Sequence, residues 1–379
     1  MSLSTKNREI PDNVKDIYNL VEYNRWLQYS KEGNRLSLIH NIASGVVLLL
    51  LFIFKVYGKI ASLFDNVYLN SLIVIFVFAF VNFVIDFIFD FISTFKIEEK
   101  YGFNKTKFPL FLKDEIMSLV IEVGLISGIV CLLVSIYPKL GYKSLLIFGA
   151  VVLLFVFISF MFSRKFMRLF NKFSRLPDGE LRDKLNDLLN KYGYKVKEIE
   201  VMNASKRTTK ANAMFTGFGK QKTIILFDNL LNILDDDEIV AVFSHELGHG
   251  KHHDTINGFL RNILMILVVT IVLFLLLYFN NIYLDNGFNI INYGFAIVIM
   301  LECIFNTFMP VIDLISNYFS RKQEYKADSF AKEAGYKDQL ISGLKKLTKT
   351  NLSSLNPHPI IVKLVYSHPT LSQRIDNLK

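Results

Sequence analysis

Long apolar runs are the feature that most limits how this chain can fold. Each has about 20 residues and few charges, the length that a helix needs to cross about 30 Å of hydrocarbon. Phe alone accounts for 35 of the 379 residues, and the mean hydropathy is +0.34. We therefore expect a predominantly α polytopic membrane bundle, with about six spans at Leu38–Val56, Ser71–Phe91, Ile116–Ile136, Leu145–Phe162, Leu260–Phe279 and Ile290–Ile312.

The charged residues alternate between the loops on either side of these runs. The loops after the first, third and fifth runs are poor in charge, and their only basic residues are Lys59, Lys139 and Lys143. Because basic loops mark the cytoplasmic side, both termini and the long middle segment are expected there. The net charge of +9 thus reflects membrane topology and gives no reason to expect nucleic-acid binding. Cys131 and Cys303 lie inside apolar runs and are interpreted as small buried residues.

The polar segments divide the chain into five parts. We expect a cytoplasmic segment at 1–37, four spans within 38–162, a small α+β catalytic domain at 163–258, two spans within 259–313, and a helical segment at 314–379. In the catalytic domain, a first helix should begin at the N-cap Asp178 and end at Gly193. A second should begin near Asp235, and strand-like runs lie between them at 198–202, 211–218 and 223–227.

The second helix contains the sequence His245-Glu246-Leu247-Gly248-His249. Histidines four residues apart lie on one helix face, so both imidazoles can bind one Zn²⁺ ion. Glu246 can then remove a proton from a water that the zinc has acidified. The alternative is a helix with an ordinary polar face. His252 and His253 offer other imidazoles, but no glutamate lies between His249 and His253, so we interpret both as supporting or solvent-facing residues.

A catalytic zinc site needs a third protein ligand and one open position. Glu324 is our candidate, because Asp328 follows it at the i+4 position and could accept the other N–H of a ligand histidine. Taken alone, this stretch could equally be a solvated charged helix. Glu302 and Glu333 are weaker rivals, since the first lies inside a span and the second has no such partner.

Several motifs resemble those of the Ste24-type CAAX prenyl proteases, the integral-membrane zinc proteases of peptidase family M48. The resemblance covers nearly the whole chain and includes the HExxH motif and the segment around Glu324 and Asp328. The other matching stretches are Glu98–Lys105 (EEKYGFNK), Ser205–Arg207 (SKR), Ala211–Phe218 (ANAMFTGF), and Ser367–Thr370 (SHPT) followed by Arg374.

The resemblance implies roles that spacing alone does not. Glu324 would be the third zinc ligand, with one Zn²⁺ per chain. His368 would lie near the developing oxyanion, and Arg374 would support it or the substrate. Asn212 and Ala213 would belong to an edge strand that pairs with the peptide backbone of the substrate.

The family also has a water-filled chamber enclosed by its membrane helices. Ionisable residues within spans usually face a cavity or a partner, and this chain has Asp86, Asp90, Glu122 and Glu302 in or near its apolar runs. The family typically has seven spans, and the helix missing here would precede the region that matches Tyr29–Arg35.

These features predict a membrane-embedded zinc endopeptidase acting on membrane-associated peptides or proteins, with prenylated CAAX ends as the substrate that the resemblance implies. The location would be the plasma membrane of a bacterium or the endoplasmic reticulum of a eukaryote. Two alternatives stay open: a quality-control protease of the HtpX type, and a non-enzymatic, zinc-stabilised protein that binds clients. A transporter is a weaker alternative because the sequence has no internal repeat. The sequence specifies no oligomeric state.

Overall fold

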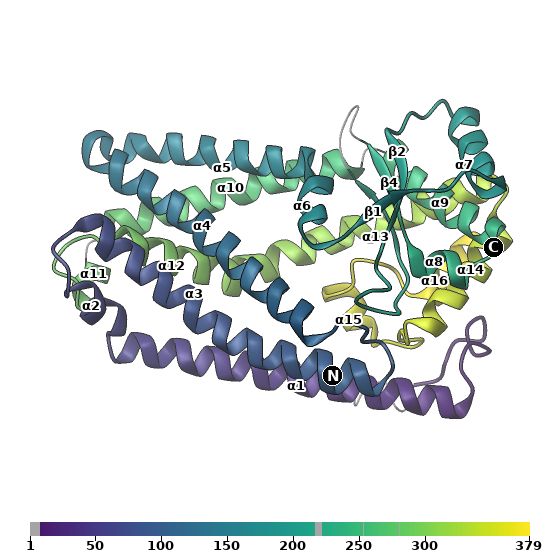
Figure 1. Cartoon of the computed structure of the whole chain (residues 1–379), viewed down its shortest axis with the longest axis horizontal. Helices are drawn as coiled ribbons and strands as arrows, with labels where there is room; N and C mark the ends of the chain where they lie inside the picture. Colours follow the sequence, from purple (N-terminus) through teal and green to yellow (C-terminus); the bar gives the residue numbers. More distant parts are fainter. Residues whose placement is uncertain (1–7, 217–221, 253, 280) are drawn as a thin grey trace.

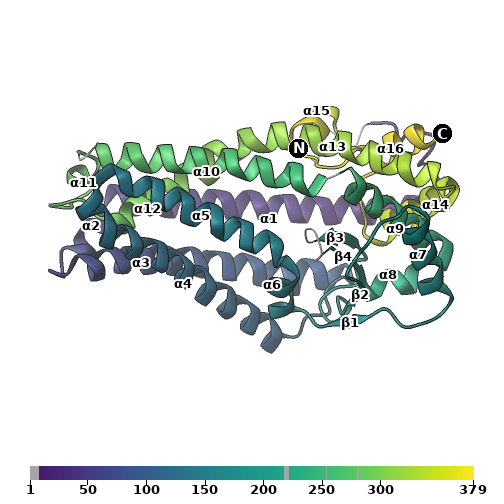
Figure 2. The same cartoon turned by 90° about the horizontal axis from the view of Figure 1, so that it is seen from above.

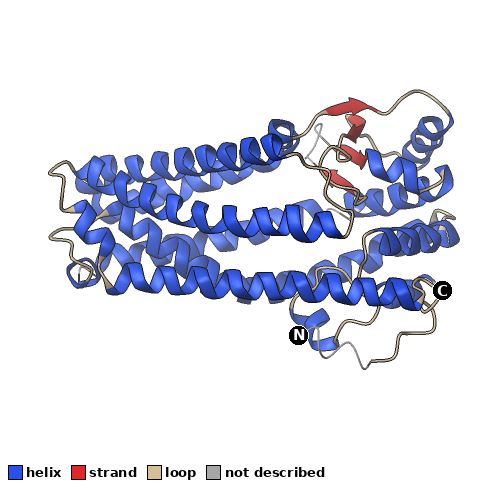
Figure 3. Ribbon diagram, turned by 60° about the horizontal axis from the view of Figure 1, so that its bottom comes forward, coloured by secondary structure: helices blue, strands red, loops and turns tan. Residues whose placement is uncertain are grey.

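The computed structural model describes residues 8–216, 222–252, 254–279 and 281–379. It is an elongated helical bundle that carries a small sheet at one end (Figure 1). The short helices α2 (Val56–Ala61) and α11 (Asn281–Asp285) lie at the opposite end, together with the turn between α4 and α5. Figure 3 shows all the strands gathered beside the catalytic-domain helices.

Five helical stretches in the described residues are long and apolar enough to cross a bilayer. One of them, residues 108–161, folds back at Gly141–Lys143 into α4 (Phe108–Leu140) and α5 (Ser144–Met161), so it contains both the third and the fourth expected spans. The membrane bundle is therefore confirmed. The other stretches include α1 (Leu20–Ile53), α3 (Val67–Ile92), α10 (Asp254–Tyr278) and α12 (Tyr293–Cys303).

The first expected span has different ends in the structure. Helix α1 begins at Leu20, because Asn19 and Glu22 form a capping box, and it ends at Ile53, just before Lys55 adopts a left-handed conformation. Its 34 residues extend about 50 Å, which exceeds the bilayer core by about 20 Å. The expected division at residues 37 and 38 therefore falls inside one continuous helix.

The sixth expected span also continues beyond its predicted end. Helix α12 passes through a π-helical turn at Ile304–Phe308 into α13 (Met309–Glu333) without a break. The expected boundary at residues 313 and 314 thus lies within α13, and the boundary at 258 and 259 lies within α10. One helical rod consequently connects the membrane region to the segment that carries Glu324.

The sheet has the strand order β1-β2-β4-β3. Strand β2 (Glu198–Met202) pairs parallel with β4 (Thr223–Phe227), while β3 (Ala213–Thr216) pairs antiparallel with β4 and leaves one edge open. The sequence did not predict β1 (Phe173–Arg175), which is only three residues long. Gly217 and Phe218 of the predicted strand lie outside the described residues.

The catalytic-domain helices surround α9 (Asp236–Lys251). The predicted start of α9 is confirmed, because Asp235 is its N-cap and forms a capping box with the buried Glu238. The N-cap of α7 (Glu180–Lys191), in contrast, is Gly179, and the predicted cap Asp178 instead pairs with Arg182. Figure 2 shows α9 close to α14 (Lys337–Thr350) and the sheet. The remaining short helices are α6 (Ser163–Phe170), α8 (Asp228–Ile233), α15 (Pro359–Leu364) and α16 (Leu371–Leu378).

Candidate metal centre

Two imidazoles and one carboxylate converge between α9 and α13. The Nε2 atoms of His245 and His249 lie 3.2 Å apart, and the carboxylate oxygens of Glu324 lie 3.5 and 3.3 Å from them, respectively. Ligands about 2.1 Å from a tetrahedral zinc ion are separated by about 3.4 Å, so these atoms fit the ion. Oε2 of Glu324 is buried and has no hydrogen-bond partner among the described residues, which is consistent with a position that a metal completes.

A second carboxylate lies behind each imidazole. Asp328, which is fully buried, is 2.9 Å from Nδ1 of His245, and Asp254 is 2.9 Å from Nδ1 of His249. Each contact leaves Nε2 directed at the centre and fixes the ring orientation. We did not anticipate Asp254 from the sequence, although it lies only five residues after His249, at the start of α10.

The environment of His249 favours its charged form in the absence of metal. Burial opposes protonation, but the carboxylates of Asp254 and Glu324 outweigh it and raise the pKa of His249 to about 10. Metal binding must therefore displace a proton from this ring.

Gly248 allows α13 to approach α9 closely enough to complete the cluster. A Cβ atom built on Gly248 would lie 2.9 Å from Cα of Ala327 and 3.2 Å from Cβ of Phe330. Ala327 is itself fully buried, between Glu324 and Asp328 in α13. The glycine inside the HExxH motif thus sets the spacing between the two helices that supply the candidate ligands.

Glu246 lies between the metal cluster and the sheet. One of its carboxylate oxygens accepts a hydrogen bond of 3.0 Å from the backbone N–H of Phe215 in β3. Burial raises the pKa of the Glu246 carboxyl, while His245, His249 and the Phe215 N–H oppose the rise. A raised carboxyl pKa suits a group that must both accept and return a proton.

His368 and Arg374 reach the cluster from the C-terminal segment. Nδ1 of His368 lies 2.9 Å from Glu324, although most of the His368 side chain is exposed. Arg374 forms two hydrogen bonds to Asp328, at 2.9 and 2.6 Å, and its guanidinium lies 3.3 Å from Nδ1 of His245. The partners of Arg374 among the described residues thus belong to the candidate metal cluster and do not include His368.

Ala213 is the first residue of the edge strand β3, and Asn212 comes immediately before that strand. The N–H of Ala213 donates to the side-chain oxygen of Asn212 at 2.9 Å, and the C=O of Asn212 accepts from Phe227 of β4. The open edge of β3 faces the same region as Glu246, because Phe215 contacts that residue. The structure therefore brings the candidate pairing strand beside the candidate base.

The rival residues lie elsewhere. His252 is exposed at the C-cap of α9, and His253 lies outside the described residues. Glu302 accepts a hydrogen bond from Asn306 in the span, and Glu333 is exposed at the end of α13. Among the predicted chamber acids, Asp86 pairs with His40 across α3 and α1 at 2.7 Å, whereas Asp90 and Glu122 are exposed along α3 and α4.

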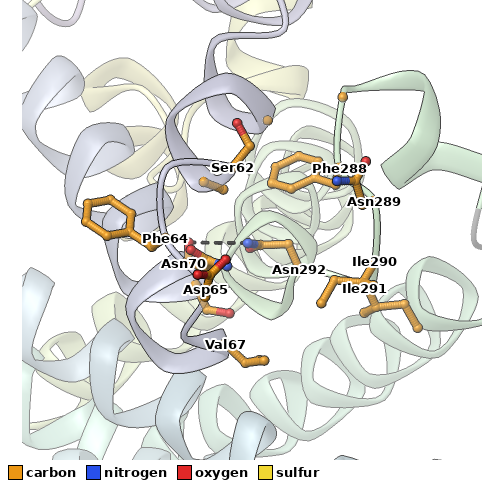
Figure 4. Close-up of a pocket in the computed structure, with 14 residues that line it drawn as sticks. Ser62, Phe64, Asp65, Val67, Asn70, Phe288, Asn289, Ile290, Ile291 and Asn292 are labelled. Atoms are coloured by element: carbon orange, nitrogen blue, oxygen red, sulfur yellow. Dashed lines mark hydrogen bonds between the residues drawn. The ribbon is translucent and has the colours of Figure 1, made fainter.

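A separate cavity of about 220 Å³ lies between α2, α3 and the loop before α12, at the end of the bundle far from the cluster (Figure 4). There the amide of Asn292 donates to the backbone oxygen of Asn70 at 3.2 Å. Asp65 is the one carboxylate among the described residues that line it, and they include no histidine or cysteine. This composition does not suit a zinc site.

Comparison with known proteins assigns the family. The model of peptidase family M48 matches residues 175–379, which include every residue of the cluster. The chain belongs to peptidase family M48. A second model, described as the CAAX prenyl protease N-terminal region with five membrane helices, matches residues 1–172.

Curated relatives are similar over most of the chain. The CAAX prenyl protease 1 homolog of Oryza sativa subsp. japonica is 35% identical over 297 residues, covering 76% of this chain and 68% of that protein. CAAX prenyl protease 1 of Saccharomyces cerevisiae is 33% identical over 312 residues, covering 76% and 67%. The crystal structure of S. mikatae Ste24p superimposes with a TM-score of 0.89 at 26% identity, covering 99% of this chain and 93% of that one.

The family and the fold together establish the class of protein. The chain is an integral-membrane, multi-pass zinc metalloendopeptidase of the M48 family. The resemblance identified from the sequence is confirmed, and the non-enzymatic alternative is not favoured.

Proposed function

We propose that this M48 protease cuts membrane-anchored peptides near their carboxyl ends, in the manner of a CAAX prenyl protease. The names of its relatives support the substrate class. The observation that carries the proposal is the contact between Glu246 and the Phe215 N–H, because it joins a base beside the metal cluster to an open strand edge. Such an edge can pair with the backbone of an extended peptide.

His245, His249 and Glu324 would hold one Zn²⁺ ion, with Asp328 and Asp254 orienting the two imidazoles. When bound, zinc would supply a Lewis acid and lower the pKa of a water molecule. Glu246 accepts a proton from the water as it attacks the scissile carbonyl, and returns that proton to the leaving amine.

The edge strand and the C-terminal segment orient the peptide. Ala213 pairs with its backbone at the open edge of β3, while Asn212, whose C=O is bonded to Phe227 of β4, supports that edge through its side chain. His368, which is largely exposed and has Glu324 as its one ion-pair partner among the described residues, can turn to donate to the developing oxyanion. Arg374 keeps Asp328, and through it His245, in place.

The orientation in the membrane follows from the distribution of basic residues. The weakly charged α2, α11 and α4–α5 turn lie at one end of the bundle, and the metal cluster lies at the other (Figure 1). We propose that the cluster and both termini face the cytoplasm. Single cysteines at Lys59 and Gly258 should then react with impermeant reagents from opposite sides, and labelling from the same side would contradict this topology.

The substrate proposal is tested with matched fluorogenic peptides that end in a CAAX sequence and carry a farnesyl or geranylgeranyl group, or neither, on the cysteine. Purified wild type should cut the prenylated peptides after the modified cysteine. If the wild type cuts the unmodified peptide with the same kcat/KM, cleavage does not require the prenyl group. If it cuts none of these peptides, the proposed substrate class is wrong.

A further inference from the structure

The segment before α1 forms hydrogen bonds with α16, the helix that carries Arg374. The amide nitrogen of Asn13 donates to the backbone oxygen of Ser372 at 3.0 Å and to the carboxylate of Asp376 at 2.9 Å. Ser372 and Asp376 are four residues apart in α16, so they share one face of that helix. Arg374 lies two residues, or about 200°, away from each and therefore projects from the opposite face.

Arg374 uses that opposite face to reach the metal cluster. It donates twice to Asp328, which in turn contacts Nδ1 of His245. Asn13 is thus connected to a candidate zinc ligand through one short helix and the side chains of Arg374 and Asp328. Because Arg374 is part of α16, its pairing with Asp328 depends on the position of that helix.

Helix α16 has only eight residues, so it needs external contacts to hold its position. Helices α13 and α14 supply part of that support, and the N-terminal segment supplies another part. Val14 is fully buried, and Ile17 and Tyr18 are nearly so, in a cluster that also contains Leu371 and Ile375 of α16. The same segment therefore packs against α16 through apolar contacts and is hydrogen-bonded to it through Asn13.

Further polar contacts attach this segment to α14 and to the loop that follows α14. The hydroxyl of Tyr18 lies 2.9 Å from the backbone oxygens of both Thr348 and Ser353, which share its one donated proton. The amide of Asn356 donates to the backbone oxygen of Arg8 at 2.8 Å, and Lys345 pairs with Asp16. The N-terminal segment thus contacts the C-terminal segment at several separate points. Among these polar contacts, the one made by Asn13 involves the residues closest in sequence to Arg374.

We propose that Asn13 is a positioning residue for this protease, which sets the placement of α16 and thereby the Arg374–Asp328 pair behind His245. The side-chain oxygen of Asn13 is buried and has no partner among the described residues, whereas its nitrogen serves both acceptors on α16. The amide nitrogen is therefore the group that matters, and a side chain without donors should not replace it.

The test compares Asn13→Ala with Lys15→Ala in the full-length, zinc-loaded protein. Lys15 is an exposed residue of the same segment, and it pairs with the exposed Asp12. We expect Asn13→Ala to lower kcat about tenfold with little change in KM, in line with the loss of other outer contacts of metal sites. It should also speed zinc release to a chelator by a similar factor, while Lys15→Ala changes neither.

Two further variants keep the result unambiguous. Asp376→Ala removes one of the two acceptors of Asn13, so it should also lower kcat and speed zinc release, by a smaller factor. This variant tests the proposal even if Asn13→Ala folds poorly. In an Arg374→Lys background, Asn13→Ala should have little additional effect, because both changes act on the same pair.

The inference rests on the proposed function, but zinc release tests it separately. If wild type cuts no peptide, the substrate proposal fails, and faster zinc release from Asn13→Ala would still support the role of Asn13. Unchanged kcat and unchanged zinc release in Asn13→Ala would overturn that role alone. An equally large loss of kcat in the Arg374→Lys background would also overturn it, since Asn13 would then act by another route.

Discussion

The carboxylate of Asp254 lies 2.9 Å from Nδ1 of His249, and it comes from the first residue of a membrane-spanning helix. Helix α10 therefore begins at the metal cluster and continues into the bundle. Because α13 also runs from the bundle to the cluster, two membrane helices contribute directly to the geometry of the site. The position of the candidate ligands thus depends on the membrane region as well as on the small sheet.

Replacing Asp254 with asparagine should weaken zinc binding. The amide lacks the charge that orients the His249 ring and increases its basicity, and loss of such a contact typically costs about 10–100-fold in metal affinity. The affinity can be measured by competition with a chromophoric chelator. Asp187→Asn, which changes an exposed carboxylate in α7, should bind zinc like wild type. Equal zinc affinity in Asp254→Asn and wild type would contradict a role for Asp254.

Replacing Gly248 with alanine should separate α9 from α13. The added Cβ would lie only 2.9 Å from the backbone of Ala327, so the helices must shift, at a cost of about 1–3 kcal/mol in the free energy of unfolding. Both the melting temperature and the zinc content should fall. Gly33→Ala, in α1 with no atom within 4 Å of the new Cβ, should cause neither loss. A fully zinc-loaded, equally stable Gly248→Ala protein would show that the close approach is dispensable.

Zinc binding should strengthen as the pH rises. The pKa of His249 is raised to about 10 in the metal-free structure, so the ring carries two protons at neutral pH. Since zinc binds only the neutral imidazole, at least one proton must leave, and below about pH 10 each unit of pH should raise the apparent affinity about tenfold per proton released. Calorimetry in buffers of different ionisation enthalpy measures that proton release. Affinity that does not change between about pH 6 and pH 8 would exclude such competition.

Hydropathy predicted the membrane bundle because long apolar runs have few alternatives to a spanning helix. It did not predict that α1 begins at Leu20, since residues 20–37 carry several charges and continue the helix outside the apolar run. The capping box of Asn19 and Glu22 was the sequence signal for that start. Strand β1 had no comparable signal, because its three residues are positioned by pairing with β2.

At the site, His245, Glu246 and His249 were predictable because one helix fixes their relative positions. The structure places Glu324 and Asp328 of α13 beside them, although these two residues follow His249 by 75 and 79 positions in the chain (324 − 249 and 328 − 249). Asp254 was missed because its contact depends on the angle between α9 and α10, which the sequence pattern does not specify. The link from Asn13 to Arg374 joins opposite ends of the chain and could be recognised only from the tertiary structure.

The central claim is that Glu246 acts on a water held at the cluster of His245, His249 and Glu324. The most direct measurement is cleavage of the prenylated peptide by wild type and by Glu246→Gln, with the zinc content of both assayed in the same preparations. Glu333→Gln, an exposed glutamate in α13, is the matched control. The account predicts that Glu246→Gln keeps its zinc and loses about 10²–10⁴-fold in kcat, while the control keeps both. Undiminished cleavage by a zinc-loaded Glu246→Gln protein would contradict it.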